Sequence, residues 1–169
     1  MEVWEAIRSK RAVRKFTDQP LANNAVERIL DAGRRSQSSK NVQPWHFIAI
    51  RDRDTLQKLS KQGDFLGHVA GSTLCVVIAA STPYDLPKVM FDIGQCASYM
   101  QLAALEVGVG SCLGTIYDAE GTRALLGIPD DVQVQMLISF GYPAFDPDRK
   151  GAGKAGRKPL NDVVHWDKW

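Results

Sequence analysis

Residues 38–47 read SSKNVQPWHF and connect two patterned segments of the chain. An amphipathic helical pattern comes before them, and residues 46–51 begin to alternate as a strand does. Such a connection needs little more than a Gly or Asn that ends the helix. Here two serines, an Asn and a Gln stand beside Pro44 and Trp45. Packing beneath the strand explains Trp45, but the density of polar groups requires another explanation.

Hydrophobic patterns elsewhere predict alternating helices and strands. We expect helices over residues 3–10, from 24, from 52, over 92–107 and from 118 to 127, and strands over 47–51, 74–80, 111–117 and 134–140. Asn24 and Glu27 have the spacing of a capping box at the second helix. The run 74–80 is apolar without alternation, which is typical of a central strand covered on both faces. By itself, the alternation of elements favours a parallel α/β sheet.

Two segments indicate contact with a second subunit. Residues 92–107 are apolar or small nearly all the way round the predicted helix, so most of its sides must be buried. Residues 146–159 are rich in Gly, Pro and charge, and residues 160–166 then become strand-like. We interpret residues 146–169 as a C-terminal arm that docks on the partner of a homodimer.

The composition indicates an ordinary soluble globular protein. The chain has 169 residues, of which 44% are hydrophobic and 24% charged, with a formal charge of +2. This length suits one domain spanning 1–169. No basic stripe interleaved with aromatic residues predicts nucleic-acid binding, and no apolar run is long enough to span a membrane. Three cysteines in apolar surroundings predict reduced, packed thiols and a cytoplasmic protein.

Several familiar site types are excluded. GVGSCLG at 108–114 fails the G-x-G-x-x-G spacing and leads from a helix into a strand, so close packing explains its glycines better than a dinucleotide does. His46, His68 and His165 have no Cys, Asp or Glu at ligand spacing, and we expect no metal site. No local nucleophile–base pair predicts a catalytic side chain.

Four motifs occur in a definite order along the chain: SKRAVRKF at 9–16, SSKNVQPWHF at 38–47, GVGSCLGTIYD at 108–118 and GRKPLNDVVHW at 156–166. Together they resemble the flavin mononucleotide (FMN)-dependent nitroreductase family, and the chain is similar to its short, minimal members. The resemblance implies an α+β fold rather than a parallel one. The expected architecture is a three-layer α/β/α sandwich whose central sheet is mixed but mainly antiparallel.

The resemblance also implies an FMN site at the interface of an obligate homodimer. It places cations and small residues against the phosphate, the ribityl chain and the flavin ring, and polar groups of the 38–47 motif against the partner's flavin. The implied contacts are Lys10, Arg11, Ala12 (where many members carry a Ser), Arg14, Ser38, Ser39, Asn41, Gln43, Leu113, Gly114, Thr115, Arg157 and Lys158. Arg14 falls at the flavin N1–C2=O edge, where a cation stabilises the negative charge of the reduced ring.

The implied activity is a ping-pong oxidoreductase reaction. NAD(P)H would reduce FMN at N5, and a small acceptor such as a nitroaromatic or a quinone would then take the electrons. Alternatives remain on the same scaffold: a flavin store or redox sensor, a reductive dehalogenase or a flavin-fragmenting enzyme. Substrate-pocket and core roles are equally compatible with four further residues: Tyr84, Leu86, Met90 and Phe91.

Overall fold

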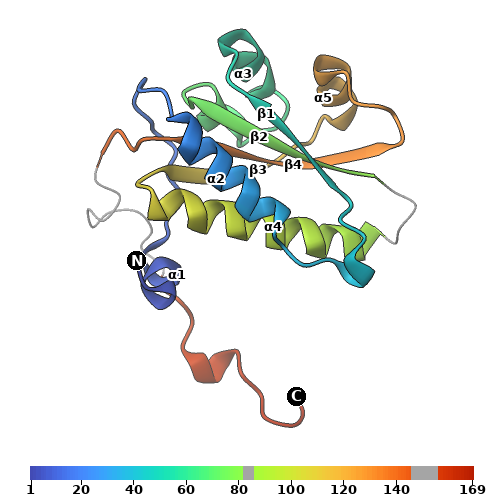
Figure 1. The fold of residues 1–169 in the computed structure, drawn as a ribbon. Helices are drawn as coiled ribbons and strands as arrows, with labels where there is room; N and C mark the ends of the chain where they lie inside the picture. The colour runs from blue at the N-terminus through green and yellow to red at the C-terminus, as the bar shows by residue number, and fades with distance from the viewer. Residues whose placement is uncertain (82–85, 146–155) are drawn as a thin grey trace.

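A four-stranded sheet with the order β1-β2-β4-β3 forms the centre of the structure (Figure 1). The structure is a computed structural model that describes residues 1–81, 86–145 and 156–169. The strands are β1 (Trp45–Ile50), β2 (Leu74–Ser81), β3 (Gly110–Thr115) and β4 (Val132–Gly141). Nearly every residue of β2 is buried, as its unbroken apolar run predicted.

All neighbouring strands pair antiparallel, so the parallel sheet favoured by the alternation alone is wrong. β2 and β3 do run in the same direction, but β4 lies between them and pairs with both. The alternation of helices and strands correctly predicted that a helix connects β2 to β3. It could not predict that β4, which comes later in the sequence, would lie between them. A parallel bridge from Ala12 to Ser111 makes the sheet mixed but mainly antiparallel, as the family resemblance implied.

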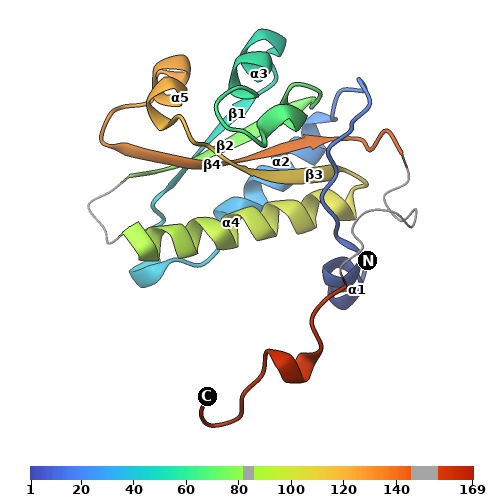
Figure 2. The ribbon, with the colours of Figure 1, turned by 180° about the vertical axis from the view of Figure 1, so that it is seen from behind.

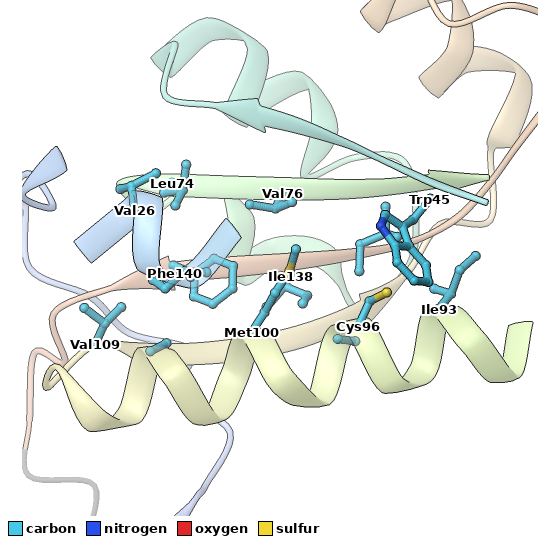
Figure 3. Close-up of a cluster of buried hydrophobic side chains, with 14 of the residues drawn as sticks. Val26, Trp45, Leu74, Val76, Ile93, Cys96, Met100, Val109, Ile138 and Phe140 are labelled. Atoms are coloured by element: carbon cyan, nitrogen blue, oxygen red, sulfur yellow. The ribbon is translucent and has the colours of Figure 1, made fainter. Parts of the chain in front are cut away.

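Helices cover both faces of the sheet. α2 (Asn23–Arg34) and α4 (Leu86–Glu106) lie on one face, whereas α3 (Arg53–Leu59) and α5 (Ala119–Leu126) lie on the other (Figures 1 and 2). One apolar cluster therefore fills each side of the sheet. Figure 3 shows the buried cluster on the α2/α4 side, which includes Trp45, Met100 and Phe140 and confirms that Trp45 packs in the core.

The capping residues predicted from the sequence are correct for α3 and α5 but wrong for α2. Asp52 caps α3 by accepting from Thr55 N at 2.8 Å, and Asp118 caps α5 by accepting from Gly121 N at 2.8 Å. The predicted capping box on α2 is wrong, because the N-cap is Ala22 and makes no side-chain hydrogen bond. Burial of one face of α2 fixes its register there and leaves Asn24 inside the first turn.

The C-terminal segment 160–166 is not a strand, which corrects the sequence prediction. Leu160–Asp162 forms one 3₁₀ turn after Pro159. Asn and Asp favour such turns, because their side chains compete for backbone hydrogen bonds. Trp166 is 84% exposed, and the segment extends away from the sheet (Figures 1 and 2).

Other apolar side chains also face outward. α1 (Val3–Ser9) buries none of its residues, and Trp4 is 69% exposed. On α4, Phe91 is 73% exposed, and Tyr99 is also exposed. Within the described residues, none of the helices has the length and apolar character needed to cross a membrane.

Gly33 permits the close approach of α2 to α4. A Cβ atom there would lie 2.3 Å from Met100 Cε and 3.2 Å from Phe47 Cζ. We expect Gly33→Ala to lower the free energy of unfolding by about 1–3 kcal/mol in urea titrations, because the core must shift. The matched Gly71→Ala variant has open space at its Cβ position and should stay near wild type. Equal stability of the two variants would contradict this packing role.

Candidate functional site

The N-terminal cations lie along the free edge of β3. Residue Ala12 bridges to Ser111, and Val13 N donates to Ser111 O at 2.9 Å. This pairing fixes the backbone that carries the predicted site residues Lys10, Arg11 and Arg14. A cleft of about 300 Å³ opens beside it, lined by residues that include Lys10, Arg11, Gln101, Leu105 and Ser111.

These cations have no carboxylate partner among the described residues. None of the ion pairs of the described chain includes Lys10, Arg11 or Arg14. Burial lowers the pKa of Lys10, an effect that Cys112 opposes and Arg14 reinforces. Burial raises the pKa of Cys112, while the charges of Arg14 and Lys10 act against that rise. The edge of β3 is thus positively charged and suited to an anionic ligand.

β3 presents alternate side chains to the two sides of the sheet. Leu113 and Thr115 are exposed, whereas Gly114 is buried. A Cβ atom at Gly114 would lie 2.3 Å from Leu66 Cδ2, so the glycine makes room for packing from within the protein. This requirement is independent of the predicted approach of a flavin to the backbone.

A buried polar group supports β3 from its inner side. His68 Nδ1 lies 2.7 Å from Ser139 Oγ, and Ser139 Oγ donates to Cys112 O at 3.4 Å. Among the described residues, no three His, Cys, Asp or Glu side chains converge as metal ligands do.

His68 gives stability a pH dependence of known sign. Burial, and secondarily Arg14, lowers the pKa of His68 from its ordinary value of 6.5. Below pH 6.5 the His68 side chain is protonated in the unfolded chain but remains neutral in the folded chain. The free energy of unfolding therefore falls as the pH decreases towards the folded-state pKa. We expect His68→Gln to flatten this part of the urea-unfolding profile, and His46→Gln, at an exposed position of β1, to leave it unchanged. An unaltered slope in His68→Gln would show that other groups cause it.

The predicted loop residues Ser38, Ser39, Asn41 and Gln43 lie at the other end of α4. Ser38 and Ser39 line an open cleft with Phe91 and Asp92, near the start of that helix. The cleft at β3 instead reaches Gln101 and Leu105. At about 1.5 Å per residue, these two parts of α4 are roughly 14 to 21 Å apart. One chain therefore does not bring its two groups of predicted site residues together.

Arg157 and Lys158, the predicted phosphate clamp, form a third separate group. Both are exposed, and within the described residues neither forms a side-chain hydrogen bond or ion pair. Of the possible pocket residues, Met90 packs against the core and Phe91 lines the cleft beside the loop. Tyr84 and the side chain of Leu86 lie outside what the structure describes.

Several polar residues that no sequence pattern predicted lie next to the predicted groups. Asp92 lies beside the loop, and its Oδ2 accepts from Ser39 N at 3.3 Å. A carboxylate within an otherwise apolar helix was the signal that could have identified it. Gln101 Nε2 donates to Ser111 Oγ at 3.3 Å below the cationic edge. No local signal pointed to Ser139, because its partner His68 is distant in sequence.

Comparison with known proteins gives a consistent family. Residues 7–62 and 65–142 match the nitroreductase family. An Archaeoglobus fulgidus protein, provisionally named an NADH dehydrogenase/NAD(P)H nitroreductase, is 32% identical and covers 99% of both chains.

Solved structures agree with this match. The chain is 26% identical to an FMN-dependent nitroreductase from Clostridium difficile, with a TM-score of 0.86 and 99% and 100% coverage. It is 25% identical to a provisionally named nitroreductase from Desulfovibrio desulfuricans in complex with FMN, with a TM-score of 0.83 and 100% and 98% coverage. The family resemblance and the fold class inferred from sequence are thus confirmed. The chain belongs to the nitroreductase family.

Proposed function

We propose that this protein is a homodimeric, FMN-dependent oxidoreductase that takes electrons from NAD(P)H. Family membership and the names of similar proteins support the reaction class and the cofactor. The observation that carries the proposal is the edge of β3, where Lys10, Arg11 and Arg14 form no ion pair with a described carboxylate. Arg11 and Arg14 are exposed and Lys10 is half-buried, and such a cluster of cations favours an anionic ligand through charge-assisted hydrogen bonds.

The chemistry of this edge fits FMN. A phosphate monoester needs charge-assisted donors, which Lys10 and Arg11 supply. The reduced flavin ring needs a fixed cation near N1 and O2, which Arg14 supplies. We assign Ala12, Leu113, Gly114 and Thr115 to the surface next to the ring and the ribityl chain. Arg157 and Lys158 are assigned to the phosphate through the arm formed by residues 146–169.

A site shared between two chains explains why the loop 38–43 lies far from β3. In the proposed dimer, Ser38, Ser39, Asn41 and Gln43 complete the partner's site. The outward-facing apolar side chains of α1 and α4, including Trp4 and Phe91, supply surface for the interface. Apolar area of this kind is what obligate dimers bury. We propose one domain per chain, with the C-terminal arm exchanged between subunits.

When bound, FMN would supply two-electron chemistry that amino-acid side chains do not offer. The chain holds and orients the group, balances its charge and limits access of water. Arg14 keeps a positive charge at the edge of the site, and the His68–Ser139 hydrogen bond fixes the backbone of β3 through Cys112 O. No side chain is proposed as a general acid or base.

We propose two half-reactions at one site, with a nitroaromatic or a quinone as the small acceptor. The donor and the acceptor would bind in turn, and we assign both to the open cleft next to the loop. A reducing compartment such as the cytoplasm is proposed as well. It is supported by three buried, unpaired thiols at Cys75, Cys96 and Cys112.

The visible spectrum of the purified protein tests the cofactor. We expect a yellow protein, or one that turns yellow with FMN, and tighter binding of FMN than of flavin adenine dinucleotide by fluorescence quenching. Rapid NAD(P)H oxidation that depends on an added quinone or nitroaromatic would distinguish an enzyme from a flavin store. A colourless protein that leaves FMN fluorescence unquenched would refute the proposal.

A further inference from the structure

The loop formed by residues 38–43 has an unfavourable backbone. Lys40, Asn41 and Gln43 have φ values of 52°, 55° and 52°, in the left-handed region. Side chains with a Cβ atom rarely adopt this conformation, and it persists only where surrounding contacts impose it. The contacts that hold the loop in this conformation therefore affect how it binds a ligand.

Both ends of the loop are tied down. Ser38 Oγ accepts from Gln43 N at 2.9 Å, which closes the loop across its base. At the exit, Pro44 O accepts from Ser81 N at 3.0 Å, and Trp45 is buried in the core. The remaining question is what fixes the entry, where the chain leaves α2.

A row of α4 side chains fixes this entry. Met100 lies against Gly33, as described above. One turn earlier, Cys96 Sγ lies 2.7 Å from Ser36 Oγ, and one turn earlier again Asp92 Oδ2 accepts from Ser39 N at 3.3 Å. Residues four apart share one face of a helix. This face of α4 thus follows the chain from the end of α2 into the loop.

The middle contact has a defined direction. Ser36 Oγ donates to Gly33 O at 2.8 Å, so it accepts from the Cys96 thiol. Burial raises the pKa of Cys96 to about 11, and the thiol keeps its proton at neutral pH. This contact is therefore neutral, and its polar atoms are satisfied within the core.

The last contact differs because it uses a carboxylate. Asp92 is only 7% exposed, although a buried carboxylate is costly to desolvate. It accepts the backbone N–H of Ser39, the residue immediately before the left-handed segment. An apolar side chain would serve packing alone, so the position of this acceptor points to control of the loop.

We propose that Asp92 is a positioning residue that holds the loop 38–43 in its strained, ligand-ready conformation. This inference rests on the proposed function, in which the loop completes the partner's FMN site. In this role Asp92 acts through Ser39 N and so sets the direction of the hydroxyl and amide groups that follow, from a position that also lines the cleft beside the loop. Part of the ordering needed for binding is thereby present before FMN arrives.

The test compares Asp92→Ala with Asp92→Asn in the full-length, FMN-loaded protein. Flavin release after dilution is followed by fluorescence, amide hydrogen exchange is measured over residues 38–43, and thermal stability is recorded alongside. Loss of a hydrogen bond to a charged acceptor should speed release by Asp92→Ala about tenfold. Asp92→Asn keeps an acceptor oxygen for Ser39 N and should stay close to wild type in release and exchange. Asp54→Ala, exposed on α3, is the matched control.

The outcomes distinguish failure of the positioning role of Asp92 from failure of the proposed FMN-dependent function. Wild-type release and exchange rates in Asp92→Ala would overturn the positioning role. Equal acceleration in Asp92→Ala and Asp92→Asn, with equal loss of stability, would show a merely structural role and overturn it too. If wild type binds no FMN, the proposed function fails, and exchange over residues 38–43 alone decides whether Asp92 orders the loop. If Asp92→Ala does not fold, Asp92→Leu keeps a side chain of similar size without an acceptor for Ser39 N and should give the same faster release; an unchanged rate would again overturn the proposal.

Discussion

Arg14→Ala is expected to lower the flavin midpoint potential by roughly 30–60 mV, the value of one charge-assisted hydrogen bond in a two-electron couple. Reduction by NAD(P)H should slow roughly ten- to a hundredfold, because the cation stabilises charge that develops during the reaction. Arg14 is suited to this role because it lies at the edge of β3 and pairs with no described carboxylate. Spectroelectrochemistry and stopped-flow reduction of the flavin-loaded variant measure the two effects.

The loss should fall on the rate of reduction rather than on NAD(P)H affinity. Arg14→Lys keeps the charge without the planar donor fork and should recover part of the potential. Lys15→Ala, at the exposed neighbouring position, removes a charge of the same sign and should leave the potential near wild type. An unchanged potential in flavin-loaded Arg14→Ala would place the charge-stabilising group elsewhere.

Removal of residues 160–169 is expected to weaken the dimer at least a hundredfold and to lower FMN occupancy with it. The truncated segment carries exposed Leu160, Val163 and Trp166, whose apolar area we assign to the partner subunit. Large aromatic side chains commonly dominate interface energies, at about 2 kcal/mol or more each. Sedimentation across a dilution series, with detection at protein and flavin wavelengths, measures assembly and occupancy together.

A point variant separates the arm from general effects of truncation. Trp166→Ala should weaken the dimer by roughly thirtyfold if this ring is buried against the partner. Tyr117→Ala also removes an exposed aromatic ring, but near α5, away from the proposed interface, and should leave assembly unchanged. A truncated monomer that carries a full complement of FMN would contradict the shared site.

The sequence predicted those parts of the fold that depend on local chemistry. Asp52, Asp118 and Gly127 set helix ends as expected, because capping and left-handed termination involve residues only a few positions apart. The direction of strand pairing could not be read in this way. Whether β4 lies between β2 and β3 depends on contacts between distant segments, and only the family resemblance carried that information.

In the candidate site, too, residues that act locally could be predicted from the sequence, whereas residues that act through distant partners could not. Lys10, Arg14 and the 38–43 loop stood out because their polar groups lie close together in the sequence. Asp92 and His68 act through partners 53 and 71 positions away, Ser39 and Ser139, so no motif identifies them. The C-terminal arm failed as a strand prediction because valines favour strands, whereas Pro159 and Asn161 begin a turn.

The pairing of Ala12 with Ser111 has a consequence for the life of the protein in a crowded solution. A bare edge strand is a template on which other chains can add, and β3 would be such an edge without the residues that run beside it. The segment that pairs with β3 also carries Lys10, Arg11 and Arg14, and their positive charges oppose the pairing of a further strand at this edge. The same residues therefore protect the edge of β3 from aggregation and form the proposed anion site. A substitution that detaches this segment from β3 should be deleterious even in cells that never need the reaction.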